Sequence, residues 1–151
     1  MWAFPALAVL AGAAITFQAS MNARLGVLLK NPVLATAIAF LFACFFTLLF
    51  MLINQRQLPV YADIRSIPTY LWFGGILSAF GVGSYYYLIP KMGVGSMMSF
   101  ALSGQLILAI IAGHFGWFEQ PIKPITPKVI IGIFAMVLGI NLINGGTRNV
   151  Y

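Results

Sequence analysis

The charged residues of this chain are placed so that five long apolar runs lie between them. The runs contain no Asp, Glu, Lys or Arg and cover residues 2–23, 31–55, 66–90, 92–117 and 129–147. A helix that crosses the hydrocarbon core of a bilayer, roughly 30 Å thick, needs about 20 mainly apolar residues. Each run can therefore cross a membrane once but not twice. The sequence predicts an all-α integral membrane bundle of five transmembrane helices, in one domain over residues 1–151. The expected spans are approximately 2–23, 32–54, 68–90, 93–113 and 127–145.

The composition agrees with a chain surrounded by lipid. Hydrophobic residues make up 62% and charged residues 7% of the sequence, whereas a soluble domain averages about 45–50% and about 25%. The net charge of +6 comes from basic residues scattered between the runs, so we expect no nucleic-acid binding, which needs a basic face or run. The single cysteine, Cys44, excludes an intrachain disulfide. No metal-ligand spacing, phosphate loop or nucleophile–base pair is present, so we expect no metal, no cofactor and no enzymatic activity.

Prolines mark the limits of several spans. Asn31-Pro32 and Thr126-Pro127 each combine an N-cap residue type with proline at the first helical position. Pro90 is expected to close the third span, because proline is disfavoured in a helix interior. The first run lacks the basic segment and cleavage site of a secretory signal peptide, so we interpret it as a retained helix.

Basic residues are divided equally between the two sides of a five-span chain. One side carries Arg56, Arg65, Lys123 and Lys128, and the other carries Arg24, Lys30, Lys91 and Arg148. Because an excess of Lys and Arg on the cytoplasmic side sets orientation, this chain has no electrostatic preference for one insertion. Insertion in both orientations, giving an antiparallel pair, and a fixed orientation both remain open.

Amide side chains inside the spans are the main candidates for a substrate site. Gln18 and Asn22 stand four residues apart in the first span and share a helical face. Together they can hold a polar substrate or form a structural hydrogen bond between helices. Gln105 lies near the middle of the fourth span and needs a polar partner. We expect Gln105 to face Gln18 and Asn22 across a central cavity, with Tyr86 as an aromatic wall.

Other residues of the spans have a structural interpretation that competes with a functional one. Ser96, Ser99 and Ser103 form a stripe that favours close helix packing, although Ser103 is also counted as substrate-lining. The three tyrosines at 85–87 favour an interfacial aromatic belt, with at least one facing inward. His114 is interpreted as amphipathic surface. The glycines expected to allow helix packing are Gly75, Gly93, Gly104, Gly132 and Gly139.

Three ordered motifs carry a family resemblance over nearly the whole chain. They are Gln18-Ala-Ser-Met-Asn22-Ala-Arg-Leu-Gly, Tyr86-Tyr-Leu-Ile-Pro-Lys-Met-Gly93, and Ser103-Gly-Gln105-Leu followed by His114-Phe-Gly. This pattern resembles the YdcZ-like family, a small bacterial branch of the drug/metabolite transporter superfamily. The resemblance implies a five-helix protein of the bacterial inner membrane, similar to one half of a ten-helix transporter, that pairs with a second copy or a related chain. Members often carry an acid where this chain has Gly113, so a proton-linked role of that acid is in doubt here.

The expected function is transport of a small polar metabolite by alternating access, as a dimer. The only acids, Asp63 and Glu119, lie between the spans, which disfavours a multidrug antiporter with a membrane carboxylate. Two alternatives remain open: a small channel, and a non-transporting membrane subunit whose polar groups only mediate helix packing. Neither the substrate nor the direction of transport can be read from the sequence.

Overall fold

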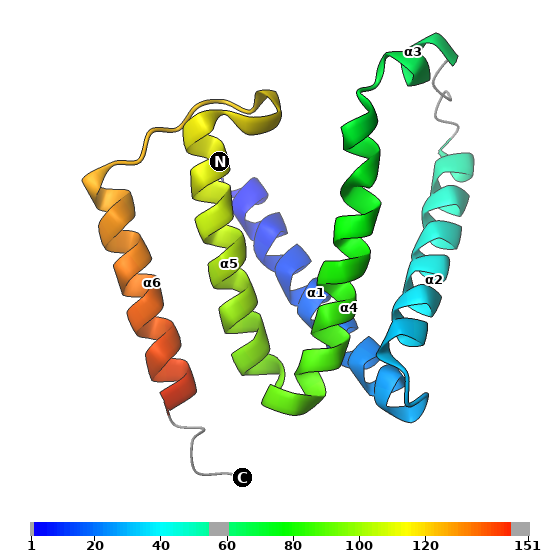
Figure 1. Ribbon diagram of the computed structural model, residues 1–151, viewed down its shortest axis with the longest axis horizontal. Coiled ribbons are helices and arrows are strands. Elements are labelled where there is room, and N and C mark those ends of the chain that lie inside the picture. Colours follow the sequence, from blue (N-terminus) through cyan, green and yellow to red (C-terminus); the bar gives the residue numbers. More distant parts are fainter. Residues whose placement is uncertain (1, 55–60, 146–151) are drawn as a thin grey trace. The chain divides into compact units, whose positions relative to one another are not determined.

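The computed structural model describes residues 2–54 and 61–145, and every regular element in these ranges is helical. Figure 1 shows the elements in chain order. They are α1 (Ala3–Leu28), α2 (Pro32–Ile53), α3 (Tyr61–Ser66), the 3₁₀ helix η1 (Thr69–Phe73), α4 (Gly74–Met92), α5 (Val94–Phe115), the 3₁₀ helix η2 (Trp117–Glu119) and α6 (Pro127–Gly145). The all-α class is therefore confirmed for the described residues. The helices form two compact units, Met1–Lys91 and Met92–Tyr151, which we describe separately.

Four of these helices are long and apolar enough to cross a membrane, namely α1, α2, α5 and α6. The third predicted span is different, because it is divided into η1 and the 19-residue α4. Helix α4 is not among the four, since its glycines, serines, tyrosines, proline and lysine lower its mean hydropathy. Four candidate membrane helices are thus established, whereas the sequence predicts five.

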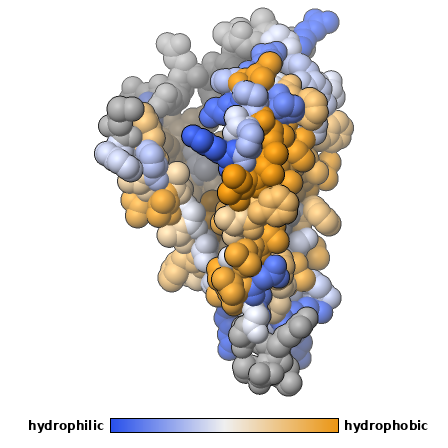
Figure 2. Space-filling view, turned by 90° about the vertical axis from the view of Figure 1, so that its left-hand side faces the viewer, coloured by the Kyte–Doolittle hydropathy of each residue, from blue (hydrophilic) through white to orange (hydrophobic). Residues whose placement is uncertain are grey.

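The long helices present apolar side chains outward. Only 6% of the most apolar 18-residue window of each of the four candidate membrane helices is buried within the chain. On the face drawn in Figure 2, hydrophobic residues form a broad band with hydrophilic residues above and below it. Such an outward apolar surface is the arrangement expected when lipid, rather than water, is the solvent.

In the first unit, α1 and α2 pack closely through small residues. The buried residues of α1 are Ala19, Ala23 and Gly26, which lie on one face of the helix. A Cβ atom on Gly26 would lie only 3.2 Å from the Pro32 Cα atom and 3.5 Å from the Ala35 Cβ atom. Glycine at position 26 therefore permits the close approach of the two helices just before the turn that joins them.

The helix starts follow the predicted caps. Asn31 accepts a hydrogen bond from the Leu34 backbone N–H (3.0 Å) with its side-chain oxygen, and Pro32 is the first residue of α2. Likewise, α6 begins at Pro127, directly after Thr126. These two N-terminal boundaries of the prediction are confirmed.

The predicted end of the third span at Pro90 is wrong by two residues. Pro90 lies inside the last turn of α4, which continues to Met92. The break comes at Gly93, which has a φ of 81°, a conformation that glycine adopts without strain. Gly93, which we predicted to pack helices, therefore permits the turn between α4 and α5.

Candidate functional site

Two amides of α1 form the first part of the candidate site. Gln18 and Asn22 lie one helical turn apart, and the Asn22 Nδ2 atom donates a hydrogen bond to the Gln18 Oε1 atom (3.0 Å). Gln18 is exposed and Asn22 is half-buried. Both lie beside the buried face of α1, because Ala19 and Ala23 directly follow them in the sequence. The packing of α1 on α2 thus fixes the direction in which the two amides point.

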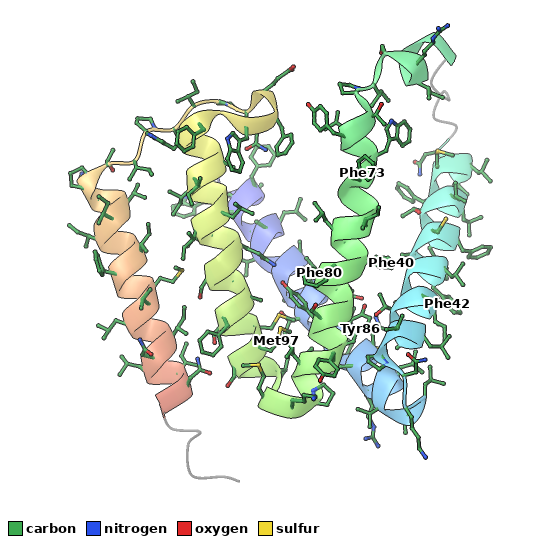
Figure 3. All side chains as sticks on the ribbon, viewed as in Figure 1. Phe40, Phe42, Phe73, Phe80, Tyr86 and Met97 are labelled. Carbon is green, nitrogen blue, oxygen red and sulfur yellow. The ribbon has the colours of Figure 1, made fainter. Side chains whose placement is uncertain are left out.

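Tyr86 of α4 completes the arrangement. Its side chain is only 1% exposed, and it is the largest fully buried side chain of the described residues. The hydroxyl accepts a hydrogen bond from Asn22 Nδ2 (2.9 Å) and donates a longer one to Gln18 Oε1 (3.4 Å). Figure 3 shows Tyr86 in the lower part of α4, among the helices of the first unit. We call Gln18, Asn22 and Tyr86 the amide–tyrosine cluster.

The amide–tyrosine cluster keeps hydrogen-bonding capacity that its internal bonds do not use. The three bonds use Gln18 Oε1, Asn22 Nδ2 and the Tyr86 hydroxyl. The two N–H groups of the Gln18 amide and the Asn22 Oδ1 acceptor make no hydrogen bond with the described part of the chain. A polar molecule can therefore bind to a donor and an acceptor that lie one turn apart on α1.

A second close approach brings α4 against α2 near the amide–tyrosine cluster. A Cβ atom on Gly83 would lie 3.3 Å from the Thr36 Oγ1 atom, and Thr36 is itself buried. The Thr36 hydroxyl donates its hydrogen bond to the Pro32 carbonyl (2.8 Å), so its polar group is satisfied within α2. Gly83 and Tyr86 are three residues apart and share one face of α4.

An apolar pocket of about 200 Å³ lies between α2 and α4. Its lining residues are small or hydrophobic apart from one threonine: Val33, Thr36, Ala37 and Phe40 from α2, and Ala79 and Gly83 from α4. Ala79, Gly83 and Tyr86 follow one another at four and three residues, the spacing of a single helical face. The face of α4 that lines this pocket, which we call the α2–α4 pocket, therefore continues to the tyrosine of the cluster.

The other two predicted substrate-lining residues belong to the second unit. Ser103 donates a hydrogen bond to the Ser99 carbonyl (2.7 Å), and Gln105 is exposed on α5. The structure thus brings Gln18, Asn22 and Tyr86 together within one unit and places Ser103 and Gln105 on α5 of the other. That Gln105 faces Gln18 and Asn22 stays a prediction.

A polar link between α5 and α6 involves a residue that the sequence analysis missed. Asn144 Nδ2 donates a hydrogen bond to Ser99 Oγ (3.0 Å) and another to the Ile140 carbonyl (2.8 Å). The interpretation of the serine stripe as a helix-packing face is therefore supported at Ser99. The signal for Asn144 was available, since Asn141 and Asn144 are two amides within an otherwise apolar run.

The three consecutive tyrosines do not act as one group. Tyr86 is buried, which agrees with the expectation that at least one tyrosine of residues 85–87 faces inward. Tyr87 is 51% exposed, and its hydroxyl accepts a hydrogen bond from Lys91 Nζ (2.6 Å). The roughly 100° rotation between neighbouring helix positions separates the two environments.

All five glycines predicted to pack helices have open space beside them. A Cβ atom would meet no described atom within 4 Å at Gly75, Gly93, Gly104, Gly132 or Gly139. The close helix contacts in the first unit instead involve Gly26 and Gly83. Helix packing at the five predicted positions stays a prediction.

The segment between α5 and α6 folds back onto the end of α5. Gly116 ends the helix with a φ of 63°, and the Lys123 backbone N–H then donates to the Gly113 carbonyl (2.8 Å). The Ile125 backbone N–H donates to His114 Nδ1 (3.3 Å). His114 is half-buried and accepts this bond from the connector, a contact that its interpretation as amphipathic surface did not include.

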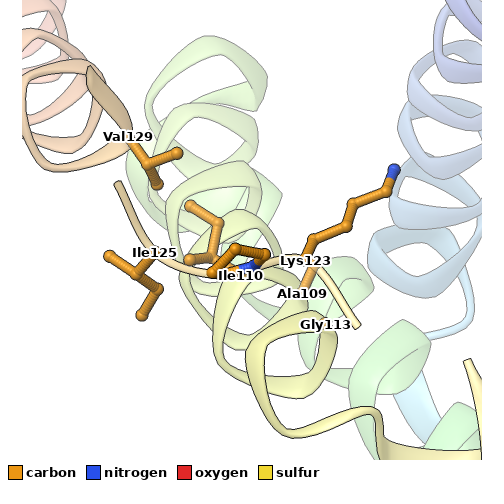
Figure 4. Close-up of a pocket in the computed structure, with 7 residues that line it drawn as sticks. Ala109, Ile110, Gly113, Lys123, Ile125 and Val129 are labelled. Atoms are coloured by element: carbon orange, nitrogen blue, oxygen red, sulfur yellow. The ribbon is translucent and has the colours of Figure 1, made fainter. Parts of the chain in front are cut away.

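A second apolar pocket, of about 230 Å³, lies under this connector. Figure 4 shows its lining, with the Lys123 ammonium extending away from the other labelled side chains. The lining residues are Ala109, Ile110 and Gly113 of α5, Lys123, Pro124 and Ile125 of the connector, and Val129 of α6. Among the described residues, no three His, Cys, Asp or Glu side chains come together that could hold a metal ion.

Comparison with known proteins gives one match. Residues 3–142 match the model of the family described as "Putative inner membrane exporter, YdcZ". No curated protein and no solved structure matches the chain. The family match covers almost the entire sequence and agrees with the membrane-length apolar helices. The chain therefore belongs to the YdcZ inner membrane exporter family and is a multi-pass protein of the inner membrane.

Proposed function

We propose that this chain is a half-transporter that exports a small polar metabolite by alternating access. The observation that carries the proposal is the amide–tyrosine cluster: three polar side chains from α1 and α4 are hydrogen-bonded to one another and still offer free donors and an acceptor. Polar groups inside membrane segments are costly and usually face a protein interior or a wet cavity. The family match supports the exporter class.

In this proposal α4 is the fifth span, in addition to the four more apolar helices. A single copy then resembles one half of a ten-helix carrier, and the second half is another copy of the chain or a related chain. The equal division of basic residues supports an antiparallel homodimer, although two of these residues, Arg56 and Arg148, lie outside the described ranges. Inverted repeats of this kind form a binding site near the membrane midplane. Gln105 and Ser103 would line that site with the amide–tyrosine cluster.

Transport can be tested without knowing the substrate. Proteoliposomes loaded with a protein-free bacterial metabolite extract should release at least one species, at a rate that saturates with its concentration, as mass spectrometry can follow. Gln18→Leu and Gln105→Leu should abolish the release while membrane insertion stays intact. Asn141→Leu is the matched control, because this amide is on α6 and donates only to the Val137 carbonyl (3.0 Å). Release no faster than from protein-free liposomes would contradict the proposal, and non-saturating release would indicate a channel.

The span count and the orientation can be tested in one experiment. A Cys44→Ser chain with cysteines at Gln57 and Gln120 is labelled outside intact cells with an impermeant polyethylene glycol maleimide. Five spans place both positions on the same side, so each molecule should carry two tags or none, and insertion in both orientations should give both populations. Four spans, with α4 outside the membrane, would give one tag on every molecule.

A further inference from the structure

The amide–tyrosine cluster leaves a specific pattern of hydrogen-bonding groups for a ligand. The Gln18 amide offers two N–H donors and Asn22 Oδ1 offers an acceptor, because the remaining polar atoms of the cluster are used internally. A ligand that bonds to both the Gln18 amide and Asn22 Oδ1 must carry an acceptor and a donor close to each other. A carboxamide or a comparable group with a carbonyl oxygen beside an N–H has this pattern.

Within the described helices α1, α2 and α4, no charged side chain is directed at the amide–tyrosine cluster. Helix α2 contains no charged residue, and the charged residues of α1 and α4 are Arg24 and Lys91. Arg24 is exposed two residues beyond Asn22, about 200° around the helix. Lys91 is directed to Tyr87, with its Nζ atom 4.0 Å from the ring centre. Because an ion without a partner is costly inside a membrane segment, the site favours a neutral ligand.

The α2–α4 pocket provides an apolar surface on the same face of α4 as Tyr86. It has a volume of about 200 Å³, and a cavity of about 150 Å³ is sufficient for a benzene molecule. The face of α4 formed by Ala79 and Gly83 leads from this pocket to Tyr86. A ligand can therefore place its polar group at the amides and a ring or short aliphatic chain between α2 and α4.

We propose that the site binds neutral amphiphiles, with a carboxamide-like group at Gln18 and Asn22 and an apolar ring or short chain in the α2–α4 pocket. This inference rests on the proposed function, since it names the substrate class of the same site. It also fixes the part of the ligand that each helix recognises: α1 recognises the polar group, and α2 with α4 recognises the apolar group.

The proposal can be tested with four small probes. Purified protein in lipid nanodiscs is titrated with radiolabelled benzamide, and benzoate, benzylamine and acetamide are added as competitors. Benzoate and benzylamine keep the ring but carry a negative or a positive charge, whereas acetamide keeps the carboxamide and lacks the ring. Benzamide should bind at least about tenfold more tightly than each of the three, because each lacks one of the two recognised features.

Three variants assign the binding to the named groups. Gln18→Leu removes the free donors and should weaken benzamide binding by up to about tenfold. Ala37→Leu fills the α2–α4 pocket and should weaken the binding of benzamide while leaving the binding of acetamide unchanged. Asn141→Leu removes an amide of α6 and should leave the binding of both benzamide and acetamide unchanged. Equal or tighter binding of a charged analogue, no binding of benzamide, or unchanged binding by Gln18→Leu would overturn the proposal.

The same probes separate this proposal from the proposed function. Release of benzamide from proteoliposomes is measured beside its binding. Benzamide binding with the expected pattern but without release would reject transport and support the ligand class. Saturable release of benzoate or benzylamine in preference to benzamide would support transport and reject the ligand class.

Discussion

The hydroxyl of Tyr86 provides the most direct test of the described packing. Tyr86→Phe removes one oxygen atom from a side chain that is 1% exposed and leaves the ring in place. Two hydrogen bonds are lost, one of 2.9 Å with Asn22 and one of 3.4 Å with Gln18. A side-chain hydrogen bond between membrane helices contributes about 0.6 kcal/mol on average. Because the second bond is long, we expect a total loss of about 1 kcal/mol in the free energy of unfolding.

The loss can be measured by reversible unfolding in mixed micelles of dodecyl maltoside and dodecyl sulfate, followed by circular dichroism. Tyr87→Phe is the matched control, since Tyr87 is the next residue on α4, is 51% exposed and bonds only to Lys91. For this control we expect a change within about 0.5 kcal/mol, as for most surface substitutions.

A double-mutant cycle with Asn22→Ala separates the 2.9 Å bond from other effects of the substitution. The two changes together should cost less than the sum of their separate costs, by about 0.6 kcal/mol, because they remove the same interaction. Additive costs would mean that Asn22 and Tyr86 do not interact in the folded chain. Equal effects of Tyr86→Phe and Tyr87→Phe would refute the burial on which the candidate site depends.

Three further substitutions test the local geometry in the same unfolding assay or by proteolysis. Gly26→Ala should destabilise the chain by about 1–3 kcal/mol, since its Cβ would lie 3.2 Å from backbone; Gly12→Ala, with nothing within 4 Å, should have no cost or stabilise slightly. Asn31→Ala should cost about 1 kcal/mol through loss of the α2 N-cap, and no change would contradict the capping bond. His114→Phe removes the acceptor for Ile125 N–H and should speed proteolysis of the α5–α6 connector, whereas an unchanged cleavage rate would show that the bond does not hold this segment.

The features that could be predicted from the sequence are those set by local chemistry. Apolar runs of membrane length predicted the long helices, and an asparagine followed by proline predicted the start of α2. The end of α4 was placed too early because the proline rule was applied to Pro90, whereas backbone conformation ends the helix at Gly93. Proline is disfavoured in a helix interior but is tolerated in the last turn of α4.

The partners of the polar side chains could be predicted only in part. Gln18 and Asn22 meet because they are one turn apart, which the helical period already implies. Tyr86 was expected as an aromatic wall near them, but its direct hydrogen bonds to both amides depend on how α4 lies against α1, and no local pattern contains this information. The contribution of Asn144 to the α5–α6 contact depends in the same way on the pairing of two helices.

The properties that keep α4 out of the four candidate membrane helices also make it suitable for the proposed site. Its glycine at position 83 allows contact with Thr36, and its tyrosine at position 86 supplies the hydroxyl of the amide–tyrosine cluster. A helix of this composition gains little from contact with lipid, because small and polar residues bury less apolar area. In the proposed half-transporter, α4 would therefore be covered by other helices rather than by lipid. A second copy that covers α4 would at the same time enclose Gln18 and Asn22, so dimer formation and completion of the site would be one event.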